Sequence, residues 1–150
     1  IYGGITVEDD VFLGPSCVLT NVTNPRSQVS RKTLYEKSLI RRGATVGANA
    51  TIVCGITLGR YCFIGAGAVI TKDVPDYGLV LGNPGKLASF ISRHGHKLQF
   101  DDSNHAICPE SNYWYKKAGD EVRCLDLDED EPLPTELSFG SQDYDSFKHR

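Results

Sequence analysis

The sequence of 150 residues has no methionine, a single tryptophan and no long apolar run. No window approaches the roughly 20 apolar residues that a membrane-spanning helix needs, so we expect no membrane partner. The start lacks the charged, apolar and cleavage regions of a signal peptide, and we expect a cytoplasmic protein. Because methionine is absent and the chain opens on Ile1 in mid-pattern, we expect a fragment or a processed form.

Cysteine pairs with metal-ligand or redox spacing are also missing. The five cysteines are an odd number, and no two of them form a CxxC pair. This pattern argues against a disulfide framework and a zinc ribbon, and we predict no metal. Cys17 and Cys62 fall at small, inward positions of the repeat described below, so we expect them to be buried as small hydrophobic residues.

Charge is distributed unevenly along the chain. Residues 1–100 carry 11 Lys and Arg against 6 Asp and Glu, a net +5, whereas residues 101–150 carry 5 against 13, a net −8. The basic part is suited to an anionic ligand, and we expect the acidic part to be solvated. No basic cluster is interleaved with aromatic residues, so we expect no nucleic-acid partner.

A strict six-residue repeat is the strongest signal in the sequence. In the sixes IRRGAT, VGANAT, IVCGIT, LGRYCF, IGAGAV and ITKDVP, each first position is a branched aliphatic and most fifth positions are small. The first positions, including the earlier ones, are Ile1, Val7, Leu13, Leu19, Ile40, Val46, Ile52, Leu58, Ile64 and Ile70. Neither helical spacing nor simple alternation has this period. Three sixes can close one triangular turn, and stacked turns bury the aliphatic residues, so the spacing predicts a parallel β-helix.

The repeat covers residues 1–19 and 40–75, and it is interrupted by a polar insertion at about residues 24–38. Loops that leave a rigid scaffold often carry function, although a neutral surface insertion is the alternative. We expect residues 1–86 to be one β-helix domain in which DYGLVLGNPGK forms a closing strand and turn. Apolar residues at helix-like spacing predict a capping helix over 87–98. We expect 99–150 to be an acidic, partly disordered tail with a hairpin within 106–125.

The repeat resembles the hexapeptide-repeat acyltransferases, whose fold is an all-β, left-handed parallel β-helix that is usually trimeric. The stretch EDDVFLGPSCVLTNVTNPR and the stretch GATVGANATIVCGITLGRYCFIGAGAVITKDVPDYGLVLGNPGK, followed by SRHG, are similar to nucleotide-sugar N-acetyltransferases. The resemblance covers residues 1–98 and is greatest to enzymes that act on a 3-amino sugar, such as UDP-2-acetamido-3-amino-2,3-dideoxyglucuronate. It implies a homotrimer that transfers acetyl from acetyl-CoA to a UDP- or dTDP-linked amino sugar, in the synthesis of surface polysaccharide precursors.

The resemblance also implies roles for residues at the start of the insertion. Many relatives use a histidine on the coils as general base, but the four histidines here are His94, His96, His105 and His149, all outside the repeat. In the 3-amino-sugar subgroup an asparagine occupies the matching place, which is Asn21 here. The amide of Asn21 cannot take a proton at neutral pH, so Asn21 would orient the amine and not act as a base. Its alternative role is to support a corner turn.

Further candidates follow from the resemblance and from residue chemistry. Arg26, with Asn24 and Arg31, would bind the substrate, because the guanidinium fork suits a pyrophosphate or a carboxylate. Lys72 and Lys86 resemble contacts to the phosphates of CoA, and Pro84 would lie against its adenine. Ala48 and Ala66 lie one eighteen-residue turn apart. They would let the pantetheine arm approach, although small residues also suit a tight corner.

Other readings stay open at this point. Asp9 and Asp10 are alternative bases, but a solvated acidic run explains them better. A carbonic-anhydrase-like hydrase would need three histidine ligands on the coils, which have none. An O-acetyltransferase needs a base more than an N-acetyltransferase does, because a hydroxyl is a poorer nucleophile than an amine. A non-catalytic trimeric scaffold is the reading outside the enzymes.

Overall fold

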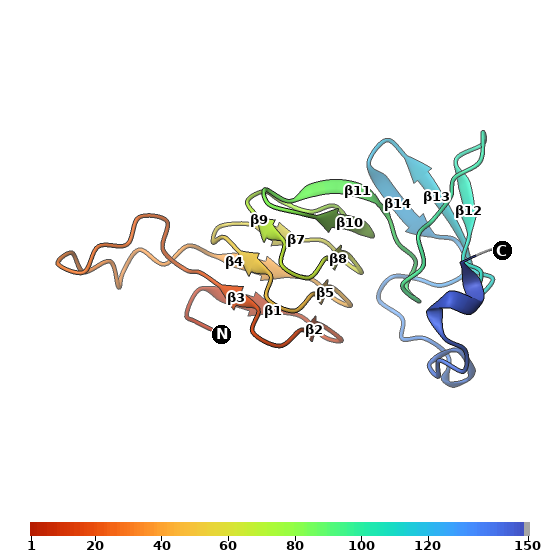
Figure 1. The fold of residues 1–150 in the computed structure, drawn as a ribbon, viewed down its shortest axis with the longest axis horizontal. Helices are drawn as coiled ribbons and strands as arrows, with labels where there is room; N and C mark the ends of the chain where they lie inside the picture. The colour runs from red at the N-terminus through yellow and green to blue at the C-terminus, as the bar shows by residue number, and fades with distance from the viewer. Residues whose placement is uncertain (149–150) are drawn as a thin grey trace.

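The computed structural model describes residues 1–148 as a solenoid of short strands followed by a smaller C-terminal sheet (Figure 1). Helical structure in this part of the chain is limited to two 3-10 turns, η1 (Thr135–Leu137) and η2 (Tyr144–Phe147). Over residues 1–148, no helix has the length and apolar character to span a membrane.

Three parallel sheets form the three faces of the solenoid. The first face contains β1 (Ile5–Val7), β4 (Ser38–Ile40) and β7 (Thr57–Leu58). The second contains β2 (Phe12–Leu13), β5 (Thr45–Val46) and β8 (Phe63–Ile64), and the third β3 (Val18–Leu19), β6 (Thr51–Ile52) and β9 (Val69–Ile70). Pairing in register of Val46 with Ile64 and of Ile52 with Ile70 repeats the eighteen-residue turn, which confirms the predicted coils.

The inward positions of the repeat build one continuous core. The buried members are Leu19, Ile40, Ala44, Val46, Ala50, Ile52, Ile56, Leu58, Cys62, Ile64, Ala68, Ile70, Val74 and Val80. Cys62 is buried as predicted, and Cys17 is half-buried against the same core. Gly47 shows how closely the coils stack, because a Cβ there would lie 2.6 Å from the backbone nitrogen of Ala66.

The strands are joined at three corners, which we name in chain order. The first corner comprises residues 8–11, 41–44 and 59–62, the second 14–17, 47–50 and 65–68, and the third 20–37, 53–56 and 71–73. The insertion is the long segment of the third corner, and it projects away from the coils (Figure 1). Stacking continues across it, because Leu19 pairs with Ile52 and Ile40 pairs with Leu58.

The predicted capping helix over 87–98 is wrong. After the expected closing strand, β10 (Gly78–Leu81), the chain turns and returns as β11 (Lys86–Phe90), antiparallel to β10. The free edge of β10 supplies hydrogen bonds that a helix would not use, and pairing still buries Phe90 and Ile91. Tertiary pairing therefore overrides the helix-like spacing of the apolar residues.

The expectation of a partly disordered tail over 99–150 is also wrong for the residues described, up to 148. The sheet of β12 (His105–Ile107), β13 (Trp114–Ala118) and β14 (Glu121–Cys124) confirms the hairpin predicted within 106–125. Its inner face shares a core with the end of the solenoid, made of Tyr77, Phe90, Leu98, Ala106, Cys108, Tyr115, Val122 and Cys124. We call residues 99–148 the C-terminal module.

Candidate functional site

Asn21 opens the long segment of the third corner and is half-buried. Its side-chain Nδ2 donates to the carbonyl oxygen of Gly3 over 3.4 Å, and its own carbonyl accepts from the amide of Glu36 over 2.9 Å. The second bond ties the two ends of the loop together at the coil. These two contacts are those expected if Asn21 supports the corner turn. Its side-chain amide lies where the loop leaves the solenoid.

The remaining substrate-binding candidates lie on the projecting loop. Arg31 donates from Nε to the carbonyl oxygen of Asn24 over 2.9 Å, so these two predicted residues are neighbours. Arg26 is exposed and forms an isolated antiparallel bridge with Val29 nearer the tip. The loop extends outward and does not fold over its own coils (Figure 1). The side chains of Arg26 and Arg31 therefore lie on a segment that extends away from the coils.

Ala48 and Ala66 stack on consecutive coils at the second corner, as the eighteen-residue spacing predicts. The amide of Gly67 donates to the carbonyl oxygen of Ala48 over 2.8 Å, which joins the two coils there. Ala48 is half-buried and Ala66 is exposed. Small side chains leave this strip of backbone open to a narrow ligand arm.

Lys72 and Lys86 are brought together by the fold. They line one cavity of about 540 Å³ between the last segment of the third corner and the hairpin of β10 and β11. Pro84 is exposed in the turn of that hairpin, immediately before the lining residue Gly85. Two ammonium groups in one groove suit an anionic ligand that carries several phosphates.

Two acidic residues moderate the charge of this groove. Asp73 lines it, but its Oδ1 accepts a hydrogen bond from the amide of Thr57 over 2.8 Å. Asp120, in the turn between β13 and β14, also lines the groove. The sequence did not point to Asp120, because only the docking of the C-terminal module places that turn beside Lys72 and Lys86.

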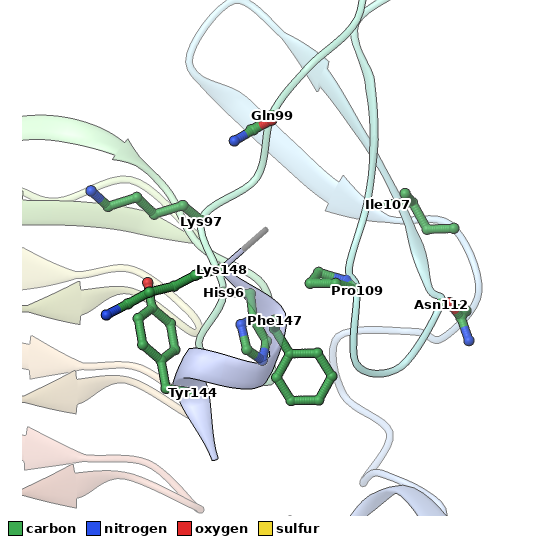
Figure 2. A pocket seen from close by; sticks show the side chains of 9 residues that line it. All are labelled: His96, Lys97, Gln99, Ile107, Pro109, Asn112, Tyr144, Phe147 and Lys148. Carbon is green, nitrogen blue, oxygen red and sulfur yellow. The ribbon is translucent and has the colours of Figure 1, made fainter. Parts of the chain in front are cut away.

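The other titratable candidates lie away from these corners. His94, His96 and His105 are all in or next to the C-terminal module, where His94 Nε2 lies 2.8 Å from the carbonyl oxygen of Leu137. His96 lines a cavity together with Tyr144 and Phe147 of η2 (Figure 2). His149 lies outside the described residues. Within residues 1–148, no three His, Cys, Asp or Glu side chains are grouped so that they could hold a metal ion.

Asp9 and Asp10, the alternative bases, face an arginine at the first corner. Arg42 Nη2 lies 3.2 Å from Asp9 Oδ2, and its Nη1 lies 3.9 Å from Asp10 Oδ2. The hydrogen bond to Asp9 raises the pKa of Arg42 above its ordinary value. Both carboxylates are mostly exposed and act as partners of a cation, which agrees with the reading of a solvated acidic run.

The candidates thus divide between corners of a single chain. Asn21 and Lys72 belong to the third corner, whereas Ala48 and Ala66 belong to the second. A ligand lying along the second corner of one chain would not reach Asn21 of the same chain without crossing a face of the solenoid. The groove at Lys72 and the amide of Asn21 therefore lie at the third corner, and the open backbone strip at Ala48 and Ala66 lies at the second.

Comparison with protein families identifies the coils. Residues 37–72 match the family described as bacterial transferase hexapeptide, with six repeats. These residues run from the end of the loop to Lys72 and include Ala48 and Ala66. The match bears out the six-residue period and the resemblance to hexapeptide-repeat acyltransferases.

Two curated relatives illustrate the range of similar proteins. The chain is 43% identical over 74 residues to the dTDP-3-amino-3,6-dideoxy-alpha-D-galactopyranose 3-N-acetyltransferase of Aneurinibacillus thermoaerophilus, covering 49% of this chain and 38% of the relative. It is 31% identical over 108 residues to the galactoside O-acetyltransferase of Lactococcus lactis subsp. lactis, covering 65% and 52% respectively. The chain therefore spans about half or less of the length of these relatives.

A solved structure gives the same fold. A galactoside acetyltransferase in complex with coenzyme A superposes with a TM-score of 0.52 at 25% identity, covering 63% of this chain and 52% of that one. Together with the parallel coils, this likeness confirms the predicted fold class, a left-handed parallel β-helix.

Proposed function

Because residues 37–72 match the bacterial transferase hexapeptide family, we propose that this chain is the coil-bearing part of an acetyl-CoA-dependent N-acetyltransferase. Its acceptor is the amino group of a UDP- or dTDP-linked 3-amino sugar. The observation that carries the proposal is the 43% identity over 74 residues to an enzyme named for 3-N-acetylation of such a sugar. The absence of histidine from residues 1–93 supports an amine acceptor, because an amine needs a base less than a hydroxyl does.

The reaction needs a positioned amine more than a strong base. The amine nitrogen attacks the thioester carbonyl carbon, a C–N bond forms, and the C–S bond breaks. The proton that the nitrogen loses passes to the departing sulfur of CoA. Asn21 would accept a hydrogen bond from the amine and aim its lone pair, and such positioning is worth several kcal/mol when the geometry is near attack.

The acetyl donor would bind in a groove along the solenoid axis, between two copies of the chain, where groups from the third corner of one and the second corner of the other can both reach it. Lys72 and Lys86 would contact the phosphates of CoA in the groove of about 540 Å³ that they share. The open strip at Ala48 and Ala66 would take the pantetheine arm, with Pro84 beside the adenine. Arg26, Asn24 and Arg31 would hold the nucleotide-sugar substrate.

The division of candidates between corners supports a homotrimer in this proposal. The loop of the third corner projects outward (Figure 1). In a homotrimer it would approach the second corner of a neighbouring copy. Asn21 and the loop arginines of one copy would then complete a site with Ala48 and Ala66 of the next. We place the enzyme in the cytoplasm and its product among the precursors of surface polysaccharides.

A thiol-release assay tests the proposal directly. The chain is mixed with acetyl-CoA and a panel of UDP- and dTDP-3-amino sugars, with a galactoside included as a hydroxyl acceptor. Turnover with a 3-amino sugar supports the N-acetyltransferase. Turnover with the galactoside alone would favour the O-acetyltransferase, whose curated relative is 31% identical to this chain. No turnover from a folded oligomer would favour the non-catalytic scaffold.

Single substitutions in the same assay test the role proposed for each residue. Asn21→Ala should lower kcat by about 10²-fold or more, because positioning is lost, with little change in the KM of acetyl-CoA. Lys72→Ala and Lys86→Ala should instead raise that KM, and Lys116→Ala, an exposed lysine on β13, is the matched control. Full activity of Asn21→Ala would remove it from the mechanism and leave it a corner residue.

A further inference from the structure

An arginine column runs along the first corner, away from the candidate site. Arg42 and Arg60 occupy the same position on consecutive coils, eighteen residues apart. Coils stack at a spacing of about 4.8 Å, so two like charges are held close together. Arg93 joins them from the segment after β11, and its guanidinium carbon lies 4.3 Å from the centre of the Tyr61 ring. We define the arginine column as Arg42, Arg60 and Arg93.

The chain's own acidic segment, residues 128–131, covers this column. Arg93 donates to the carbonyl oxygens of Asp128 over 3.2 Å and of Glu131 over 2.6 Å. Arg60 Nη2 lies 2.9 Å from Asp130 Oδ1, and Arg42 Nη1 donates to the carbonyl oxygen of Asp130. Backbone and carboxylate oxygens of one short segment thus supply all three arginines with acceptors.

The arginine column also keeps buried donors that have no hydrogen-bond partner. Four buried side-chain nitrogens in the described part of the chain have no hydrogen-bond partner: Arg41 Nε, Arg60 Nε, Arg93 Nε and His94 Nδ1. Two of them belong to the arginine column itself. A buried guanidinium that leaves a donor unused is incompletely satisfied by its partner. The acidic segment therefore contributes one carboxylate, that of Asp130, to the column and leaves two buried donors unused.

We propose that the arginine column is an anion-binding site, which residues 128–131 occupy as an internal ligand, and that a diphosphate group competes with them for it. Guanidinium forks stacked one coil apart suit the oxygens of two linked phosphates, which carry more charge than the carbonyls they would displace. This inference concerns the first corner only and does not rest on the proposed transferase activity.

Competition with an internal ligand has a measurable signature. The apparent affinity for an external anion is the intrinsic affinity reduced by the fraction of molecules in which the segment is released. A change that weakens the segment but leaves the arginines intact must therefore tighten binding of the anion. A change in the arginines must weaken it. A site without an internal competitor would show only the second effect.

The experiment is a calorimetric titration of the whole chain with inorganic pyrophosphate. Asp130→Ala removes the carboxylate that pairs with Arg60, a pair in which the aspartate is exposed and the arginine half-buried, and should tighten binding about two- to fivefold. Tyr61→Phe removes the hydrogen bond from the Tyr61 hydroxyl to the carbonyl oxygen of Glu129, 2.6 Å, and should act in the same direction. Arg60→Gln should weaken binding at least tenfold. Asp145→Ala, an exposed carboxylate paired with Lys148, is the charge-matched control and should change nothing.

Hydrogen exchange gives a second readout on the unmodified chain. Saturating pyrophosphate should speed amide exchange within residues 126–137, because the segment is displaced. Equal affinity of Asp130→Ala, Asp145→Ala and the unmodified chain would overturn the proposal. So would slower exchange in the segment, since the anion would then be adding to the closed form. If Arg60→Gln does not fold, the tightening in Asp130→Ala and Tyr61→Phe still decides the question.

Discussion

The solenoid and the C-terminal module reach a buried core by opposite routes. Strands of the solenoid are mostly two or three residues long and parallel, and each buries one aliphatic side chain against the same position of the next coil. The module uses antiparallel strands, and the core that it shares with the end of the solenoid centres on Tyr77 and Tyr115, whose rings meet edge to face at 5.4 Å. In the solenoid each coil repeats the same buried layer, whereas the core of the module is formed once, by a few residues.

The largest effect should come from breaking one layer of the solenoid. Ile64 is fully buried between Val46 and Val80 in the second face. Ile64→Ala should lower the free energy of unfolding by about 2–5 kcal/mol, because it removes buried methylenes and leaves a cavity. Denaturant unfolding measures this change. Ile107→Ala, on the exposed face of the module, is the control, and an equal loss in both would contradict the layered core.

A second prediction tests the close stacking of the coils. Gly47→Ala places a Cβ 2.6 Å from the amide nitrogen of Ala66 and 2.7 Å from the carbonyl oxygen of Ile64. Backbone cannot swing aside as a side chain can, so we expect a loss of about 1–3 kcal/mol in unfolding free energy. Gly140→Ala, where a Cβ meets nothing within 4 Å, should be close to neutral. A neutral Gly47→Ala would mean that the coils can separate there without cost.

Alkaline pH should weaken both regions through buried acids. Burial raises the pKa of the Cys62 thiol to about 12, and it also raises the pKa of Tyr77 and of Tyr115. Above the ordinary pKa of each group the unfolded chain loses its proton while the folded chain keeps it. Stability is therefore full below about pH 9 and falls above it, by at most about 1.4 kcal/mol per pH unit for each group.

Unfolding free energies measured between about pH 8 and pH 11 check this slope. Cys62→Ala removes the buried thiol and should flatten the part of the pH slope that comes from the solenoid. Alanine should fit there, because Ala44 and Ala50 occupy equivalent inward positions. A stability that rises with pH in this range would contradict the burial of these groups.

The smallest effect should come from the surface link between the regions. Arg123 on β14 pairs with Asp76 of the solenoid at 3.0 Å, and the arginine side chain is half exposed. Arg123→Ala should cost only about 0.2–1 kcal/mol, and less at high salt. Comparing it with Lys116→Ala in denaturant at two salt concentrations isolates the pair. A larger loss would mean that this link, and not the shared aromatic core, holds the module in place.

The same contrast explains what could be read from the sequence. The period of six marked the coils, their inward residues and the insertion, because each six repeats one local environment. It could not mark β11, since the partner of Phe90 and its neighbours is a strand edge that exists only after the coils have closed. The acidic stretch 128–131 looked solvated because its cations, Arg42, Arg60 and Arg93, are distant in sequence.

The candidate site was predictable only as separate pieces. Spacing placed Ala48 and Ala66 on consecutive coils, and the fold brings Lys72 and Lys86 to one groove. Asp120 entered that groove without any signal in the sequence, because its position depends on how the module docks. The eighteen-residue interval between Arg42 and Arg60, together with the opposite charges of the two halves, was the clue to the arginine column that the sequence did contain.

The long corner segment has a consequence for how such a protein can change. Leu19 and Ile40 keep their places in the stack on either side of the loop, so the loop is an insertion that leaves the rigid frame of coils unchanged. Its length and chemistry can be rewritten while the frame keeps its geometry, provided that the clasp between Asn21 and Glu36 is retained at the base. Under the proposed function, in which Arg26 and its neighbours bind the acceptor, a loop transplanted between two such frames should carry its preference for an acceptor with it.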